Sequence, residues 1–144
     1  MKRFVRLTGI FLIAAMLCGT LTGCKAFDYR KAQKLCDKGE YLEASALFSS
    51  LEDYKDSAEQ ANEAYRLYGV QLSESGNYEA SILVLETLVD TYAPAQETLN
   101  DVRIAYGEDL AKNRNYEKAV EIFKACEVNE TLQSTLDEIS NSLI

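Results

Sequence analysis

Cysteine thiols and carboxylates are the side chains of this chain that could do chemistry, because the sequence contains no histidine. Without imidazole, the chain lacks the commonest general base, the usual partner of a nucleophilic Ser or Cys, and a frequent metal ligand. The carboxylates include neighbours such as Glu108-Asp109 and Asp137-Glu138, which point in different directions on a helix. No Asp-rich calcium loop is present. We therefore expect no catalytic residue, no metal and no cofactor, with the carboxylates as solvated surface groups.

Cys24 follows a segment that differs from the rest of the chain. Lys2, Arg3 and Arg6 make its start positive, and residues 7–21 carry no charge. As a helix this uncharged run would span roughly 22 Å, which is less than the ~30 Å hydrocarbon core of a bilayer. The layout therefore favours a signal peptide over a permanent transmembrane helix.

The tetrapeptide Leu21-Thr22-Gly23-Cys24 resembles the lipobox of bacterial lipoproteins. The resemblance implies that residues 1–23 are a signal peptide that is removed, and that the thiol of Cys24, then the first residue, carries a covalent diacylglycerol or acyl lipid. Such chains would hold the protein on the extracytoplasmic face of the cell membrane. The alternatives are an ordinary signal peptide with a chance cysteine and an uncleaved anchor, and both also place the domain outside the cytoplasm.

The charge of the remaining chain is strongly acidic. Once Lys2, Arg3 and Arg6 are removed, 12 basic and 23 acidic side chains remain, a net charge of −11. Such a surface repels phosphate backbones and anionic headgroups. We therefore expect no nucleic-acid partner and no attachment to a membrane through a basic face, and we expect a basic protein or peptide as partner.

Three tyrosines, Tyr41, Tyr78 and Tyr116, mark a pattern that repeats at spacings of 37 and 38 residues. Each follows a turn-like segment that contains Gly or Asn, and we expect each to pack at a corner between two helices. Nine residues before each tyrosine stands a small residue, and seven residues after it a large one; these are Ala32, Gly69 and Gly107, then Phe48, Leu85 and Phe123. Small residues let two helices approach closely, so the pattern predicts three helix hairpins.

This pattern resembles the tetratricopeptide repeat (TPR) family, whose hairpins carry Gly-x-Tyr at the corner and Ala followed by an aromatic residue on the second helix. Gly39-Glu40-Tyr41, Ala44 and Phe48 fit it best. The later repeats have Ser81 and Leu85, then Ala119 and Phe123, and the third lacks the corner glycine. The resemblance covers about residues 28–139 and implies an all-α solenoid of about three TPR-like hairpins.

Local signals place the helix ends. Asp56-Ser57-Ala58-Glu59 is a capping box, so a long helix should run from there to about Ser75, and Pro94 suits the first turn of another that reaches about Asn113. The amphipathic stretch 130–143 should form a capping helix on the third hairpin. We therefore expect a lipidated linker at residues 24–27 and a repeat domain at 28–144.

The resemblance also implies a concave groove lined by the first helix of each hairpin. The family's groove positions correspond to Tyr29, Gln33, Glu63, Arg66, Val70, Glu74, Asp101, Ile104, Glu108 and Lys112. This face is mixed but mainly acidic. Val70 and Glu108 stand where the carboxylate-gripping members of the family have asparagine, so binding of a chaperone tail is not supported.

Two thiols and several tyrosines have simpler interpretations. Cys36 and Cys126 are expected on helices of different hairpins, and helices pack ~8–10 Å apart whereas bridged Cα atoms need about 7 Å or less, so we interpret both thiols as core-filling groups. Tyr29, Tyr65 and Tyr68 are expected to be partly exposed.

Together these features predict a non-catalytic, membrane-anchored lipoprotein that acts as a scaffold or adaptor for a protein or peptide in the cell envelope. One alternative is a ligand-binding or cell-wall-processing lipoprotein, which would need a deep pocket with convergent polar groups. Another is a subunit of a larger lipoprotein assembly.

Overall fold

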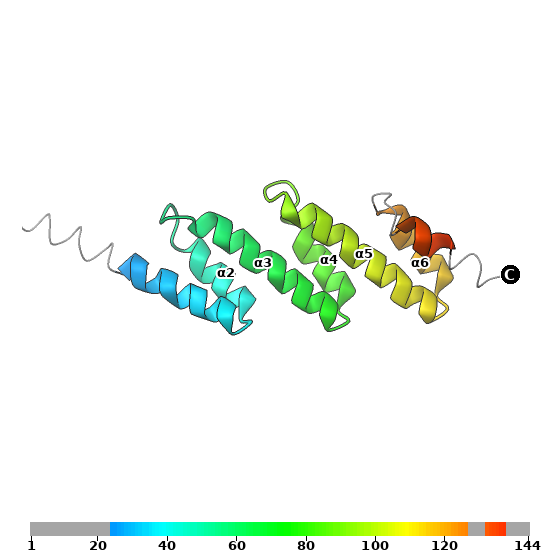
Figure 1. Cartoon of the computed structure of the whole chain (residues 1–144), viewed down its shortest axis with the longest axis horizontal. Coiled ribbons are helices and arrows are strands. Elements are labelled where there is room, and N and C mark those ends of the chain that lie inside the picture. The colour runs from blue at the N-terminus through cyan, green and yellow to red at the C-terminus, as the bar shows by residue number, and fades with distance from the viewer. Residues whose placement is uncertain (1–23, 127–131, 138–144) are drawn as a thin grey trace, which may run out of the picture. The chain divides into compact units, whose positions relative to one another are not determined.

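The computed structural model describes residues 24–126 and 132–137, and the regular structure within these ranges is entirely α-helical (Figure 1). The contacts divide the chain into two units, Met1–Ala64 and Tyr65–Ile144. The all-α class expected from the sequence is therefore confirmed for the described residues.

The first unit contains the helix of residues 24–37, helix α2 (Tyr41–Ser49) and the beginning of helix α3 (Ser57–Glu74). Its core consists of Tyr29, Ala32, Phe48, Leu51 and Ala61. The ring of Tyr29 lies edge-on to that of Phe48, with 5.3 Å between their centroids. Residues from three helices thus bury one apolar cluster, as an amphipathic helix requires.

Residues 24–27, expected to be a linker, are helical and form a turn of the helix described over residues 24–37. Lys25 joins this turn to the segment after α2, because its Nζ donates to the carbonyl oxygen of Leu51 over 3.2 Å and lies 3.5 Å from the Glu52 carboxylate. The described residues of this helix therefore include Cys24 itself.

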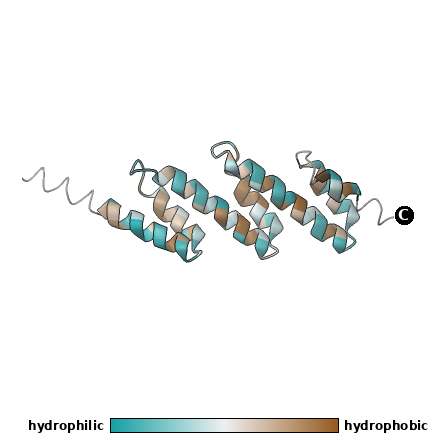
Figure 2. Ribbon diagram, in the orientation of Figure 1, coloured by the Kyte–Doolittle hydropathy of each residue, from teal (hydrophilic) through white to brown (hydrophobic). Residues whose placement is uncertain are grey.

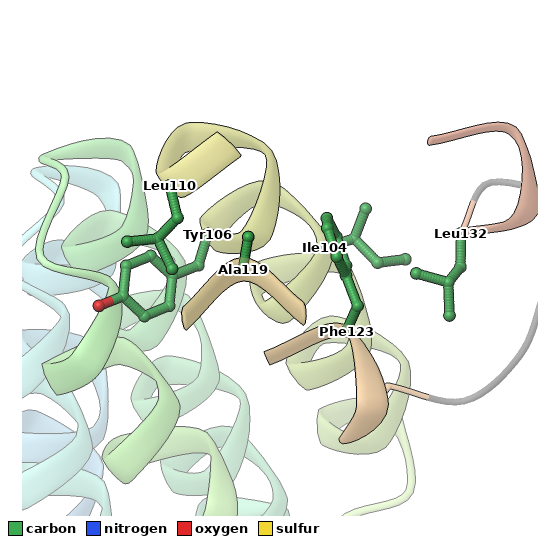
Figure 3. Close-up of a cluster of buried hydrophobic side chains, with 6 residues drawn as sticks. All are labelled: Ile104, Tyr106, Leu110, Ala119, Phe123 and Leu132. Carbon is green, nitrogen blue, oxygen red and sulfur yellow. The ribbon is translucent and has the colours of Figure 1, made fainter. Parts of the chain in front are cut away.

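The second unit contains the rest of α3 together with α4 (Tyr78–Glu86), α5 (Pro94–Lys112) and α6 (Tyr116–Lys124). Leu85, Leu99 and Val102 form one core cluster, where α4 packs on α5. A second cluster joins α5, α6 and the helical residues 132–137, and Figure 3 shows its side chains: Ile104, Tyr106, Leu110, Ala119, Phe123 and Leu132. Apolar and polar residues alternate along α5, as Figure 2 shows. The apolar side chains of this one helix belong to both clusters.

Each described hairpin turns its corner with the same hydrogen bond. The backbone N–H groups of Glu40, Asn77 and Asn115 donate to the carbonyl oxygens five residues earlier, at 2.9, 2.9 and 2.8 Å. This is the Schellman pattern, which needs a left-handed residue just before the donor. Gly39 and Gly76 supply it with φ of 77° and 78°, and Arg114 supplies it with φ of 61°.

The corner tyrosines begin the second helices as the spacing predicts, since Tyr41, Tyr78 and Tyr116 are the first residues of α2, α4 and α6. Each is half-buried, and Tyr78 packs against both clusters of the second unit. The corner-packing role is therefore confirmed for Tyr78.

The glycines nine residues before the tyrosines lie where two helices meet. A Cβ on Gly69 would stand 2.9 Å from Cγ of Leu85, and one on Gly107 would stand 2.8 Å or less from three ring atoms of Phe123. In the second hairpin, Oγ of Ser81 also donates to the carbonyl oxygen of Gly69 over 2.6 Å. The small-and-large pairing read from the sequence is thus the actual contact between the paired helices.

The helix ends agree with the local signals. Helix α3 begins at Ser57, directly after Asp56, and α5 begins with Pro94 in its first turn. Residues 132–137 pack on the third hairpin through Leu132, which is 3% exposed, and Thr135 Oγ1 donates to Glu108 over 3.1 Å. The rest of the predicted capping helix lies outside the described residues.

Candidate functional site

Cys24, the predicted lipid-bearing residue, is exposed and helical, within the helix described over residues 24–37. The predicted signal peptide at 1–23 lies outside the described residues. Within the part of the chain that the structure describes, no helix is both long and apolar enough to cross a bilayer.

Tyr29 is buried rather than partly exposed, with 7% of its surface accessible, so its prediction as a groove residue is wrong in this structure. Its ring lies in the first core, and its hydroxyl donates to Asp56 over 2.5 Å. That hydrogen bond, with burial, raises the pKa of Tyr29 to about 12, because the phenolate would face a carboxylate. Of the other groove residues in this unit, Gln33 is exposed and Glu63 is half-buried.

In the second unit, α3 and α5 carry the other predicted groove residues. Ile104 is 4% exposed and belongs to the core, so its assignment to an open groove is also wrong. The two helices lie side by side where Arg66 Nη1 donates to Thr98 Oγ1 over 3.0 Å. The remaining residues differ in accessibility, with Arg66, Val70 and Glu108 half-buried and Glu74, Asp101 and Lys112 exposed.

Burial therefore divides the predicted groove residues into core and surface. A helix position near the edge of the apolar stripe can turn to either side, and the sequence register alone does not decide which. What remains in the second unit is an exposed, mainly acidic set on the first helices of its hairpins. We call Glu74, Asp101 and Lys112 the α3/α5 surface.

Comparisons of the chain with protein-family models, curated proteins and solved structures find no match.

The thiols of Cys36 and Cys126 are free, half-buried and packed against core clusters. Burial raises the pKa of both thiols, because a thiolate is poorly solvated among apolar side chains. Sγ of Cys126 also lies 3.4 Å from the carbonyl oxygen of Ile122. These observations agree with the core-filling role expected for both residues. Tyr65 and Tyr68 are half-buried, as expected, and their rings stack on each other.

Glu79, Tyr106 and Lys118 form a titratable cluster that sequence reasoning missed, and they come from α4, α5 and α6. The Glu79 carboxylate accepts hydrogen bonds from the Tyr106 hydroxyl and, over 2.9 Å, from Lys118 Nζ, which also lies 5.2 Å from the centre of the Tyr106 ring. These bonds lower the pKa of Glu79 to about 2, whereas the pKa of Tyr106 is raised, mainly by burial.

Perturbed ionisation can mark an active site, but it also arises in structural networks. Every group of this cluster is engaged with another, and together they join three helices of the second unit. Tyr106 further stacks on Tyr78 with 5.1 Å between the ring centres. The arrangement therefore positions helices. Among residues 24–126 and 132–137, no three Asp, Glu or Cys side chains gather as a metal site.

A second feature missed by sequence reasoning is the outward side of the helix of residues 24–37. Phe27 is 71% exposed there, beside Arg30, Lys31 and Lys34, and the four side chains line a depression of about 250 Å³. The spacing 27, 30, 31, 34 could have revealed this face, because residues three and four apart lie on one side of a helix.

Proposed function

We propose that the chain is an extracytoplasmic lipoprotein, anchored by acyl lipid on Cys24, whose TPR-like hairpins act as a non-catalytic scaffold for a basic protein or peptide. The observation that carries the scaffold role is the repeated hairpin contact, in which Gly69 meets Leu85 and Gly107 meets Phe123. Repeats of this kind bury their apolar stripes against one another and leave the outer edges of their helices for partners.

The anchor rests on the lipobox-like tetrapeptide and on the exposure of Cys24. The α3/α5 surface supports a basic partner, because Glu74 and Asp101 are exposed on neighbouring helices in a chain with an acidic excess. Glu63 and Glu108 are weaker candidates for contact, since both are half-buried and Glu108 accepts the hydrogen bond from Thr135.

Site-specific photo-crosslinking in the cells that make the protein tests the binding surface. A photoreactive residue at Asp101 should give a discrete protein adduct, and the same residue at Glu121, which is exposed on α6, should not. Adducts of equal yield from both positions, or none from Asp101, would contradict a binding role for the α3/α5 surface.

Charge reversal then tests the chemistry of the partner. Glu74→Lys should reduce the Asp101 adduct several-fold, because a rim charge steers a basic partner and close like charges repel. Glu117→Lys is the matched control: it changes the net charge by the same amount at an exposed position on α6. If both variants lower the adduct equally, the effect belongs to net charge and not to this surface.

A further inference from the structure

The helix of residues 24–37 has a stripe that faces solvent along its length. Cys24, Phe27, Lys31 and Lys34 recur at intervals of three and four residues, with Arg30 beside them, so they share one side of the helix. All five are exposed. We call them the Cys24 stripe.

The opposite side of the same helix is buried. Tyr29 and Ala32, at 7% and 0% exposure, point into the first core with the half-buried Cys36. The core thus fixes the rotation of the helix, and the Cys24 stripe cannot turn inward without unpacking it.

The Cys24 stripe lies in a basic segment of an otherwise acidic chain. Residues 24–38 carry five basic and two acidic side chains, whereas residues 39–144 carry seven basic and twenty-one acidic ones. The net charge led us to expect no attachment through a basic face, but that expectation averaged over two regions of opposite sign. A surface potential is set by the nearest charges, since the Debye length is about 8 Å at physiological ionic strength.

We propose that the Cys24 stripe lies on the membrane, with its basic residues against anionic phospholipid headgroups and the Phe27 ring at the level where the acyl chains begin. This inference rests on the proposed function, because it takes Cys24 as the lipid-bearing residue. Basic residues beside an exposed aromatic ring are the composition of a helix that lies in the plane of a bilayer surface. The helix of residues 24–37 in Figure 2 shows both a hydrophilic band and hydrophobic ends.

The position of Cys24 selects the membrane as the occupant of this face. An acyl chain on Cys24 would start on the same stripe, roughly 4.5 Å along the helix axis from Phe27 and roughly 15 Å from Lys34. Cys24 is itself a helical residue, continuous with the rest of the helix, so no linker separates the lipid from the stripe. Any insertion of the acyl chains therefore brings the headgroups within reach of the basic side chains.

Replacing Phe27 with tryptophan gives a direct test, because the natural chain contains no tryptophan. The acylated Phe27→Trp protein is reconstituted in vesicles of phosphatidylcholine with brominated acyl chains, either alone or mixed with phosphatidylglycerol. In the anionic vesicles the emission should shift to the blue and be quenched by bromine. Leu42→Trp is the matched control: Leu42 is exposed on α2 of the same unit, outside the stripe, so this variant should stay unquenched.

Removing basic charges from the Cys24 stripe tests whether electrostatic attraction to the headgroups contributes to docking. Adding Lys31→Gln and Lys34→Gln to the reporter protein should lower the equilibrium constant for docking about fivefold for each charge removed. The control pair Arg114→Gln and Lys124→Gln removes equal charge at exposed positions of the second unit, outside the α3/α5 surface, and should leave the quenching unchanged. Added salt should weaken the quenching in the anionic vesicles.

Flotation of the same vesicles separates the two proposals. Phe27→Trp protein that floats with the vesicles but keeps its tryptophan emission unquenched overturns the stripe proposal and keeps the lipid anchor. Equal quenching with and without phosphatidylglycerol overturns the charge recognition. Protein that does not float at all overturns the anchor and the stripe proposal with it. An acidic peptide that is bound by Phe27→Trp in place of the anionic vesicles would assign the face to another partner.

Discussion

At the residue scale, the sequence shows that the third hairpin lacks the corner glycine of the other two, but it does not show what this does to the backbone. Gly39 and Gly76 occupy left-handed backbone that glycine adopts at little cost, and Arg114 adopts the same conformation with a side chain. The hydrogen bond from Asn115 to Leu110 is as short as in the other two corners, at 2.8 Å. The third corner thus keeps its geometry in spite of its residue.

Arg114→Gly should therefore stabilise the protein. Removing the strain of the left-handed backbone should raise the free energy of unfolding by ~1–2 kcal/mol. The greater conformational freedom of glycine in the unfolded chain should lower it by about 0.4–1 kcal/mol, so the net gain should be about 0.5–1 kcal/mol. Gly76→Ala is the mirror control, because no atom lies within 4 Å of its new Cβ and only the backbone cost remains. Urea unfolding should show the two midpoints moving in opposite directions, and a lower midpoint for Arg114→Gly would refute the assignment.

Gly107→Ala should destabilise the third hairpin. Overpacking costs ~1–3 kcal/mol, which exceeds the ~1 kcal/mol that alanine gains over glycine in helix propensity, since the rigid Phe123 ring blocks the new methyl group. Gly69→Ala meets the flexible end of Leu85 and should change the unfolding free energy less. Adding Phe123→Leu should restore part of the loss, and a double-mutant cycle with no coupling would contradict the contact.

At the scale of elements, the hairpins and their ends could be predicted because period, glycine, proline and capping residues are local signals. The groove could not be predicted with the same success. Tyr29 and Ile104 entered the core because their final orientation depends on which neighbouring side chains complete each cluster. The Glu79–Tyr106–Lys118 contacts escaped prediction for the same reason, since they join three helices far apart in sequence.

The Glu79–Tyr106–Lys118 cluster should make the free energy of unfolding depend on pH. The folded-state pKa of Glu79, about 2, lies below its ordinary 4.5, so the cluster stabilises the fold fully above pH 4.5 and loses that contribution as the pH falls toward 2. The Glu79 side chain is 64% exposed, so solvent screening keeps the effect modest.

Unfolding by urea at several pH values measures this contribution. Glu79→Gln should be less stable than the natural protein at pH 7, and the difference should shrink between pH 4.5 and 2. Glu121→Gln removes an exposed carboxylate from α6 and should show no such convergence. A difference that is constant over this range would contradict the role of the Glu79 charge.

At the scale of the whole molecule, the sequence divides into a proposed amino-terminal lipoprotein signal, a basic helix and an acidic remainder. The net charge of the whole chain does not reveal this division. It gains meaning because Cys24, the proposed lipid-bearing residue, belongs to the same helix as the basic stripe. Both functional proposals meet at this residue. A change at Cys24 should release the protein from the membrane without touching the buried clusters, since the side chain is exposed.

Metabolic labelling with a fatty-acid analogue tests that claim most directly. The natural protein should incorporate the label and remain with the membrane fraction, whereas Cys24→Ala should lose the label. Cys36→Ala is the control, because that thiol is packed against the first core and should leave labelling unchanged. Continued labelling of Cys24→Ala, or an unlabelled natural protein, would contradict the account.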